Sequence, residues 1–215
     1  MIHAVIFDMD GVLVDSEPVY YQRQIEYMRS VGVTPATTNI QDYAGYPGDQ
    51  VWAHVIPDPG LRKQVRSGFE QGIVTQPINY GTIVIPGVQE LLQHLHKHGY
   101  QTALASAGPL PGIKTMFAQT GLGRYFDSVI SGETVSRNKP DPQVYLESLA
   151  KLKVPATAAL AIEDSKTGIA AAKNAGMQVW ALQPRAYTLD QSTADYVAAD
   201  MQAILLRLRQ LEREG

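Results

Sequence analysis

The chain has 215 residues, of which 45% are hydrophobic and 18% are charged, a composition typical of a folded globular protein and unlike that of a disordered or fibrous one. Its 18 lysine and arginine residues stand against 21 aspartate and glutamate residues, so the net charge of -3 predicts no basic surface for a nucleic acid or an acidic membrane. The absence of cysteine excludes disulfides, a thiolate zinc site and a cysteine nucleophile.

The start of the sequence has no cationic region before a long apolar stretch. No window approaches the roughly 18 apolar residues that would span a bilayer. We therefore expect a cytoplasmic protein without a membrane or nucleic-acid partner, present as a monomer or weak homodimer.

The first predicted element is a strand over residues 4–7, where a short apolar run is typical of a strand buried on both faces. The segment 16–85 shows helical patterns without a convincing strand, and turn residues such as those of 45–48 divide it. We therefore expect a small helical cap domain over residues 16–85, inserted after the first strand, with the chain returning to the main domain at residue 86.

From residue 86 onward, predicted helices and strands alternate. A helical pattern precedes Gly99 and similar patterns recur later. The further strands are predicted over residues 102–105, 128–130, 158–162 and 179–182, and the further helices over residues 145–152, 169–175 and 201–211. This alternation favours an α/β fold with a doubly wound parallel sheet, a Rossmann-like core made of residues 1–15 and 86–215.

Polar residues follow the predicted strands at the points where these strands end. In chain order they are Asp8 and Asp10, then Ser106, then Lys139, and finally Glu163 and Asp164. Ligands of open parallel sheets bind beyond the carboxyl ends of the strands. We therefore expect these side chains to meet in one crevice.

The residue types in this set indicate a particular chemistry. Several carboxylates in one crevice repel each other unless a cation lies among them, and oxygen ligands favour a hard ion such as Mg²⁺. Bound Mg²⁺ commonly takes its remaining ligands from water and substrate phosphate. The hydroxyl of Ser106 and the ammonium of Lys139 suit a phosphoryl group. The set predicts a phosphoryl-transfer site with Mg²⁺ as cofactor.

Four segments carry a resemblance to a known family. They are DMDGVLVDSE (8–17), ASAG (105–108), NKPDP (138–142) and IEDSKTGIAAAKNAGM (162–177). In this order and spacing they resemble the four signature motifs of the haloacid dehalogenase-like hydrolase superfamily, specifically its β-phosphoglucomutase-like phosphatase branch with a helical cap. The resemblance covers nearly the whole chain.

The resemblance implies catalytic and phosphate-binding roles. Asp8 would be the nucleophile that becomes an aspartyl phosphate, and Asp10 would protonate the leaving oxygen and then deprotonate the attacking water. Ser106 and the backbone N–H of Ala107 would hold phosphoryl oxygens. Lys139 would neutralise the nucleophile and the phosphoryl charge.

The resemblance also implies the metal ligands. Mg²⁺ would be bound by Asp8, the backbone carbonyl of Asp10 and Asp164, with Glu163 acting directly or through water. The family further suggests a cis peptide bond between Lys139 and Pro140, which the sequence permits.

The cap decides between related activities. A β-phosphoglucomutase would be expected to have a histidine at the position of Tyr20 and an arginine near Gly48 for a distal phosphate, and this sequence has neither. We therefore expect a Mg²⁺-dependent phosphatase whose partner is a small phosphorylated metabolite such as a sugar phosphate, with a sugar-phosphate mutase as the alternative. Candidate substrate residues are Tyr20, Arg23, Tyr46 and Gly48, for which plain cap packing is also an explanation.

A function of another class stays open at this point, namely a non-catalytic protein that senses Mg²⁺ and phosphate. Receiver domains also cluster aspartates with a hydroxyl and a lysine. Their phosphoacceptor, however, lies on a later strand, and no helical insertion follows their first strand.

Two further patterns invite a functional interpretation. His94 and His98 stand four residues apart on a predicted helix, a spacing that metal sites use, but the sequence shows no carboxylate partner. We expect a solvated helix end there, where the helix dipole favours cations. Gly121 and Gly123 resemble the opening of a dinucleotide fingerprint, but Phe126 replaces the third glycine and no strand precedes them.

Overall fold

A computed structural model describes residues 2–45, 48–75 and 78–214. Within these residues, one sheet of six parallel strands has the order β3-β2-β1-β4-β5-β6. The strands are β1 (Ala4–Phe7), β2 (Gln101–Ser106), β3 (Ser128–Ser131), β4 (Ala159–Glu163), β5 (Gln178–Leu182) and β6 (Tyr196–Ala198). The predicted fold class is confirmed.

Strand β1 lies inside the sheet, with Phe7 paired to Leu104 of β2 on one side and to Ile162 of β4 on the other. All four of its residues are fully buried. Helices cover both faces, so a strand in this place has no side that meets water, which explains its continuous apolar run.

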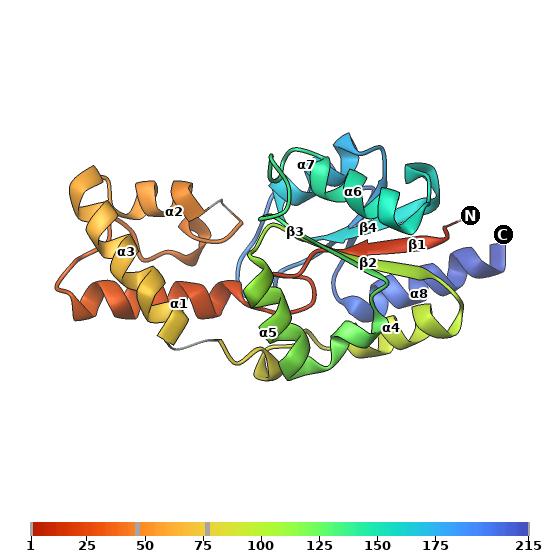
Figure 1. Ribbon diagram of the computed structural model, residues 1–215, viewed down its shortest axis with the longest axis horizontal. Coiled ribbons are helices and arrows are strands. Elements are labelled where there is room, and N and C mark those ends of the chain that lie inside the picture. The colour runs from red at the N-terminus through yellow and green to blue at the C-terminus, as the bar shows by residue number, and fades with distance from the viewer. Residues whose placement is uncertain (1, 46–47, 76–77, 215) are drawn as a thin grey trace.

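Helices cover both faces of the sheet (Figure 1). On one face lie α4 (Val88–Lys97), α5 (Leu110–Thr120) and α8 (Met201–Glu214), and on the other lie α6 (Gln143–Leu152) and α7 (Lys166–Asn174). Short 3-10 turns are found at Ile40–Asp42, Tyr80–Thr82, Leu122–Tyr125 and Ala156–Ala158. Within the described residues, we find no helix of the length and apolar character that crossing a bilayer requires.

Three further helices follow β1 and stand beside the sheet: α1 (Glu17–Ser30), α2 (Gly48–Val55) and α3 (Pro59–Thr75). They pack around a hydrophobic cluster that is separate from the two clusters on the faces of the sheet. Trp52 and Phe69 meet edge to face at its centre, with ring centroids 5.4 Å apart. Met28 of α1 is fully buried there.

The chain leaves and re-enters the sheet through two paired segments. The Asp15 amide donates to the carbonyl of Ile83 (2.8 Å), and the Ile85 amide donates to the carbonyl of Leu13 (3.0 Å). Ile78 and Tyr80 pack with the hydrophobic cluster of the sheet, so packing with the sheet begins before residue 86. The division of the chain into a core and a cap over residues 16–85 stays a prediction.

The predicted strands all occur, within one residue at each end, but the sequence analysis missed β6. This strand has three residues, of which only Ala198 is buried. It lies at the edge of the sheet beside β5. A strand with one neighbour and an exposed face lacks the apolar run by which the others were recognised.

The end of α4 differs from the expected solvated helix end. His94 is buried, with a relative exposure of 9%, and its Nε2 lies 3.0 Å from Glu212 Oε1 of α8. The sequence showed no such carboxylate partner because 118 residues separate the two side chains.

Candidate active site

Three carboxylates converge beyond the carboxyl ends of the two neighbouring strands β1 and β4. Asp8 follows β1 directly, Glu163 is the last residue of β4, and Asp164 is the next residue. One oxygen from each lies within 4.8 Å of the others. The sheet is wound in opposite directions on the two sides of this point, which is where open α/β sheets form their binding crevice.

Lys139 enters this cluster from the loop between β3 and α6. Its Nζ donates to Asp8 Oδ1 (2.6 Å) and to Glu163 Oε1 (2.7 Å), and 5% of its side chain is exposed. Burial by itself would lower the pKa of Lys139, but the two carboxylates raise it above its ordinary value, so the ammonium stays charged. The peptide bond between Lys139 and Pro140 is cis.

Glu163 is fully buried, and both oxygens of its carboxylate accept hydrogen bonds. Its Oε1 accepts from the Tyr145 hydroxyl (2.6 Å) as well as from Lys139, and its Oε2 accepts from the Asp164 amide (3.1 Å). A side chain held in this way fixes the position of Lys139. The contact of Glu163 with a metal stays a prediction. Because hydrogen bonds already occupy the Glu163 oxygens, a contact through water is favoured over a direct one.

Gly168, in the first turn of α7, makes room for Glu163. A Cβ atom at residue 168 would overlap the Glu163 carboxylate. The same turn is capped by Ser165, whose Oγ accepts from the Gly168 amide (3.1 Å). The start of α7 is therefore shaped around the carboxylate that holds Lys139.

Asp10 lies beside the cluster, and its Oδ1 accepts a hydrogen bond from the hydroxyl of Ser16. Ser16 occupies the N-cap position of α1 but its side chain makes no capping bond, so this hydroxyl orients Asp10 instead. Burial raises the pKa of Asp10 above its ordinary value, although the bond from Ser16 lowers it. A carboxyl group that keeps its proton more readily than usual suits a general acid.

Hydrogen bonds hold the loop after β2 as a turn over residues 106–108. Ser106 is fully buried and its Oγ accepts from the Gly108 amide (3.0 Å), while Ala107 is exposed and lines the cavity described below. Asn138 Nδ2 donates to the Ala107 carbonyl (3.0 Å) and Ser131 Oγ donates to the Gly108 carbonyl (2.7 Å). These bonds hold the 106–108 turn in front of Asp8 and Lys139.

The carboxylates fit a divalent cation. Burial and the neighbouring acids raise the pKa of Asp8 to about 7 in spite of Lys139, and they raise that of Asp164 well above its usual range. Such shifts mark a negative charge in excess of what one ammonium balances, and a cation would relieve it. The residues that would hold it are Asp8, Asp164 and the backbone carbonyl of Asp10.

Asp164 is held in place from two sides. Gly11 has a φ of +78°, which side chains rarely adopt, and a Cβ atom at residue 11 would overlap the Asp164 carboxylate. On the other side, Gln191 Nε2 donates to the Asp164 carbonyl (2.6 Å) and to the Leu182 carbonyl (2.7 Å). Glycine at residue 11 therefore allows this carboxylate to approach the loop after β1.

A cavity of about 580 Å³ lies over these groups, with the residues of α1, α2 and α3 on its far side. Tyr20 and Gly48, two of the predicted substrate residues, line it, whereas Arg23 is not among the described residues that do. Tyr46 lies outside the described residues. The cavity is lined on the cap side by Tyr20, Tyr21, Gln24, Tyr43, Trp52, Arg66 and Glu70.

Sequence reasoning missed several groups at this site. Tyr145 begins the predicted helix over residues 145–152, and nothing in the sequence shows that its hydroxyl reaches Glu163. Gln191 and Asn138 likewise act through backbone carbonyls that only the fold brings near them. Glu17 lines the cavity, and burial together with Asp10 and Asp8 raises the pKa of Glu17 to about 8. Its place as the last residue of the first motif was a signal for it.

The comparisons with known proteins agree with this geometry. The family model described as haloacid dehalogenase-like hydrolase matches residues 5–182, so the chain belongs to this family. Hexitol phosphatase B of Escherichia coli K12 is 35% identical over 185 residues, covering 81% of each chain. The phosphorylated carbohydrates phosphatase of Thermotoga maritima is 31% identical over 179 residues, covering 81% of this chain and 82% of its own.

Solved structures give the same result for the fold. A putative β-phosphoglucomutase from Thermotoga maritima, 27% identical, aligns with a TM-score of 0.73 over 97% of this chain and 99% of its own. A predicted phosphoglycolate phosphatase from Haemophilus somnus, 22% identical, aligns with a TM-score of 0.82 over 96% of this chain and 98% of its own. The chain is a phosphoric monoester hydrolase of the β-phosphoglucomutase-like branch.

Magnesium should stabilise the folded chain. At a concentration 100-fold above its dissociation constant, an ion that binds only the native state contributes about 2.7 kcal/mol, or about 5–10 °C in Tm for a chain of this size. The rise should be larger at pH 8 than at pH 6, because at pH 6 protons compete for carboxylates whose pKa values are raised, that of Asp8 to about 7. Calorimetry of the wild type and Asp164→Asn measures it, and an equal rise in both proteins would contradict this assignment of Asp164.

Substitution of Gly168 by alanine tests whether the shape of α7 matters to the site. Helix propensity alone predicts that Gly168→Ala stabilises the fold by about 0.5–1 kcal/mol. Because the added Cβ would overlap the Glu163 carboxylate, we expect instead lower stability and a fall in kcat of at least about tenfold. Gly72→Ala in α3, where the Cβ would meet nothing within 4 Å, is the matched control. Equal behaviour of the two variants in urea unfolding and in turnover would refute the argument.

Proposed function

We propose that the chain hydrolyses the phosphate monoester of a small hydroxylated metabolite, such as a sugar phosphate, with Mg²⁺ and through an aspartyl phosphate on Asp8. The observation that carries the proposal is the Asp8 carboxylate, which accepts a hydrogen bond from Lys139. Asp10 follows two residues later in the same loop, and the 106–108 turn lies in front of Asp8. The names of the two phosphatase relatives support a phosphorylated carbohydrate as substrate.

In the first half-reaction, an Asp8 oxygen attacks phosphorus and the bond from phosphorus to the ester oxygen breaks. Asp10 in its acid form gives its proton to the departing alkoxide, which leaves as an alcohol. Lys139, the Ser106 hydroxyl and the Ala107 amide hold the phosphoryl oxygens, and Mg²⁺, when bound, would supply further positive charge against them.

In the second half-reaction, the Asp10 carboxylate removes a proton from a water molecule that attacks the phosphorus of the aspartyl phosphate. The bond from phosphorus to Asp8 breaks, inorganic phosphate leaves, and Asp10 is again an acid. The bond from the Ser16 hydroxyl keeps Asp10 in one orientation for both steps. The cap side of the cavity limits the entry of other water while the ester is bound.

The cap supports hydrolysis over the mutase alternative. A mutase would bind a second phosphate away from Asp8, and among the described residues that line the cavity only Lys139 and Arg66 are cations. The Arg66 guanidinium is already bound by two acids, Glu70 (Nε to Oε1, 2.6 Å) and Asp49. Two carboxylates around one guanidinium leave a net negative charge, which disfavours a second phosphate.

Phosphate release from a panel of phosphorylated metabolites tests the proposal. We expect turnover of monophosphorylated sugars or sugar alcohols with Mg²⁺, its loss with EDTA and in Asp8→Asn, and a fall of about 10²–10⁴-fold in Asp10→Asn. Asp10→Asn should also accumulate a phosphoryl group on Asp8, visible by mass spectrometry. The absence of release from any compound, together with a stable phosphoryl adduct of the wild type, would favour the sensor instead.

Neutralising the acids around Arg66 should admit substrates with a second phosphate. We expect Asp49→Asn/Glu70→Gln to raise kcat/KM for sugar bisphosphates about three- to tenfold and to change that for monophosphates less than about twofold, since it removes two like charges. Glu26→Gln/Glu214→Gln, an equal charge change at exposed positions outside the described lining of the cavity, is the control. Equal gains in both double variants would mean that overall charge, and not the local arrangement, sets the preference.

A further inference from the structure

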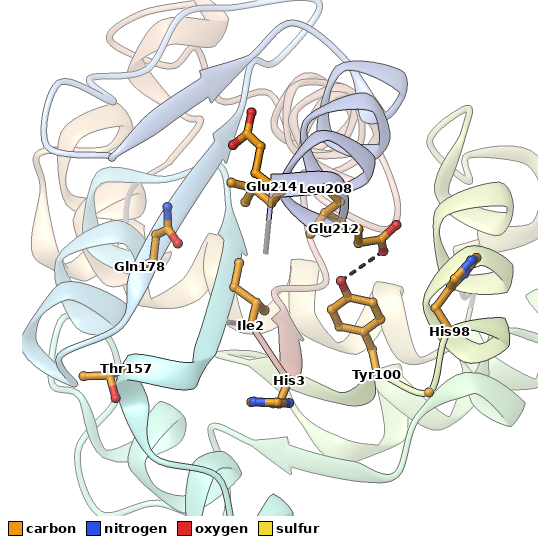
Figure 2. A pocket seen from close by; sticks show the side chains of 11 residues that line it. Ile2, His3, His98, Tyr100, Thr157, Gln178, Leu208, Glu212 and Glu214 are labelled. Carbon is orange, nitrogen blue, oxygen red and sulfur yellow. Dashed lines mark hydrogen bonds between the residues drawn. The ribbon is translucent and has the colours of Figure 1, made fainter.

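A second group of metal-ligating side chains lies at the opposite end of the sheet from the carboxylates. His94 and His98 come from the end of α4, and Glu212 comes from the last turn of α8. Figure 2 shows His98 and Glu212 on either side of Tyr100, which precedes β2, at the edge of a pocket of about 740 Å³. This pocket also contains His3 and Gln178 at the amino ends of β1 and β5. Residues of this group have no part in the reaction described above.

The three side chains lie close enough together to form a tetrahedral site after small movements. His94 Nε2 and Glu212 Oε1 are 3.0 Å apart, and the two imidazole centroids are 4.0 Å apart. One ligand atom from each residue lies within 4.8 Å of the other two. Bonds of about 2.0–2.2 Å in a tetrahedral zinc site separate the ligand atoms by about 3.3–3.6 Å, so small side-chain movements suffice.

The hydrogen bond of His98 uses its Nδ1 atom and leaves Nε2 available to bind a metal ion. Its Nδ1 lies 2.8 Å from the backbone carbonyl of His94. A carbonyl can only accept, so Nδ1 carries the proton and Nε2 keeps its lone pair. Metal-binding histidines are commonly oriented by such a bond from the other ring nitrogen. In the neutral ring this bond therefore selects the tautomer whose Nε2 can bind a metal ion.

The other two ligands are also held in place. The side chain of His94 is 7% exposed, so it has little freedom, and Glu212 Oε1 accepts from the Tyr100 hydroxyl (3.0 Å). A tyrosine that hydrogen-bonds a ligating carboxylate orients it in the same manner. His98 is exposed, which leaves a path from solvent.

We propose that His94, His98 and Glu212 bind a divalent transition-metal ion of the Zn²⁺ type, with water as the fourth ligand. Two imidazoles and one carboxylate are a donor set of zinc and its neighbours, whereas Mg²⁺ prefers oxygen ligands. The ion would take the place of the hydrogen bond between His94 and Glu212. It would tie α8 to α4, and thus add to the stability of the fold without contact to the reacting groups.

The test compares Zn²⁺ binding by untagged wild-type protein with that of His98→Ala, in excess Mg²⁺ to fill the carboxylate site. Titration calorimetry should find a Zn²⁺ ion in the wild type that His98→Ala binds at least tenfold more weakly. His96→Ala removes an exposed histidine of the same helix that is not part of the group, and should bind as the wild type does. Glu212→Gln, on the other helix, should weaken binding as His98→Ala does.

Two readouts separate this site from zinc at the carboxylates. Addition of Zn²⁺ should shift the ¹⁵N resonances of the His94 and His98 Nε2 atoms and raise Tm, and the rise should be lost in His98→Ala but kept in Asp164→Asn. Equal zinc affinity and equal Tm shifts of the wild type and His98→Ala would overturn the proposal. So would a zinc-dependent Tm shift that Asp164→Asn abolishes.

Discussion

The ammonium of Lys139 is the buried charge around which the site is built. It lies between Asp8 and Glu163, in a place that water barely reaches, and a charge there persists only if it is paired and hydrogen-bonded. Glu163 is in turn fixed by Tyr145 and by the Asp164 amide, so the ammonium has one stable position. Removal of any one partner would leave a buried charge without its counterpart, which is why these residues act as a unit.

Three carboxylates face this one ammonium, and the imbalance explains much of the local sequence. Burial and mutual repulsion raise the pKa of Asp8 and of Asp164, which means that these side chains hold more negative charge than the one ammonium balances. A side chain at Gly11 would overlap the Asp164 carboxylate, and one at Gly168 would overlap the Glu163 carboxylate. The loops thus keep an electrostatically unfavourable arrangement that a divalent cation and a phosphoryl group together would complete.

The sequence predicted the parts of this arrangement that depend on strands. A strand buried on both faces is recognised by its apolar run, and the residue after it, such as Asp8 or Asp164, then falls at the carboxyl edge of the sheet. It could not predict contacts set by packing between distant elements, such as that of the Tyr145 hydroxyl with Glu163 or that of His94 with Glu212. Ser16 is a further example, because it stands at the N-cap position of α1 but its hydroxyl donates to Asp10, a contact that the sequence does not indicate.

The two ends of the sheet differ in donor chemistry, and this difference keeps their ions apart. At the carboxyl end the ligands are oxygens, beside a cavity that would receive phosphate, and a hard ion such as Mg²⁺ suits them. At the amino end the ligands include two imidazoles, for which Mg²⁺ has little affinity. An excess of Mg²⁺ would therefore occupy one site and leave the other open, so an ion at His94, His98 and Glu212 would stabilise the contact between α4 and α8 without competing for Mg²⁺ at Asp8.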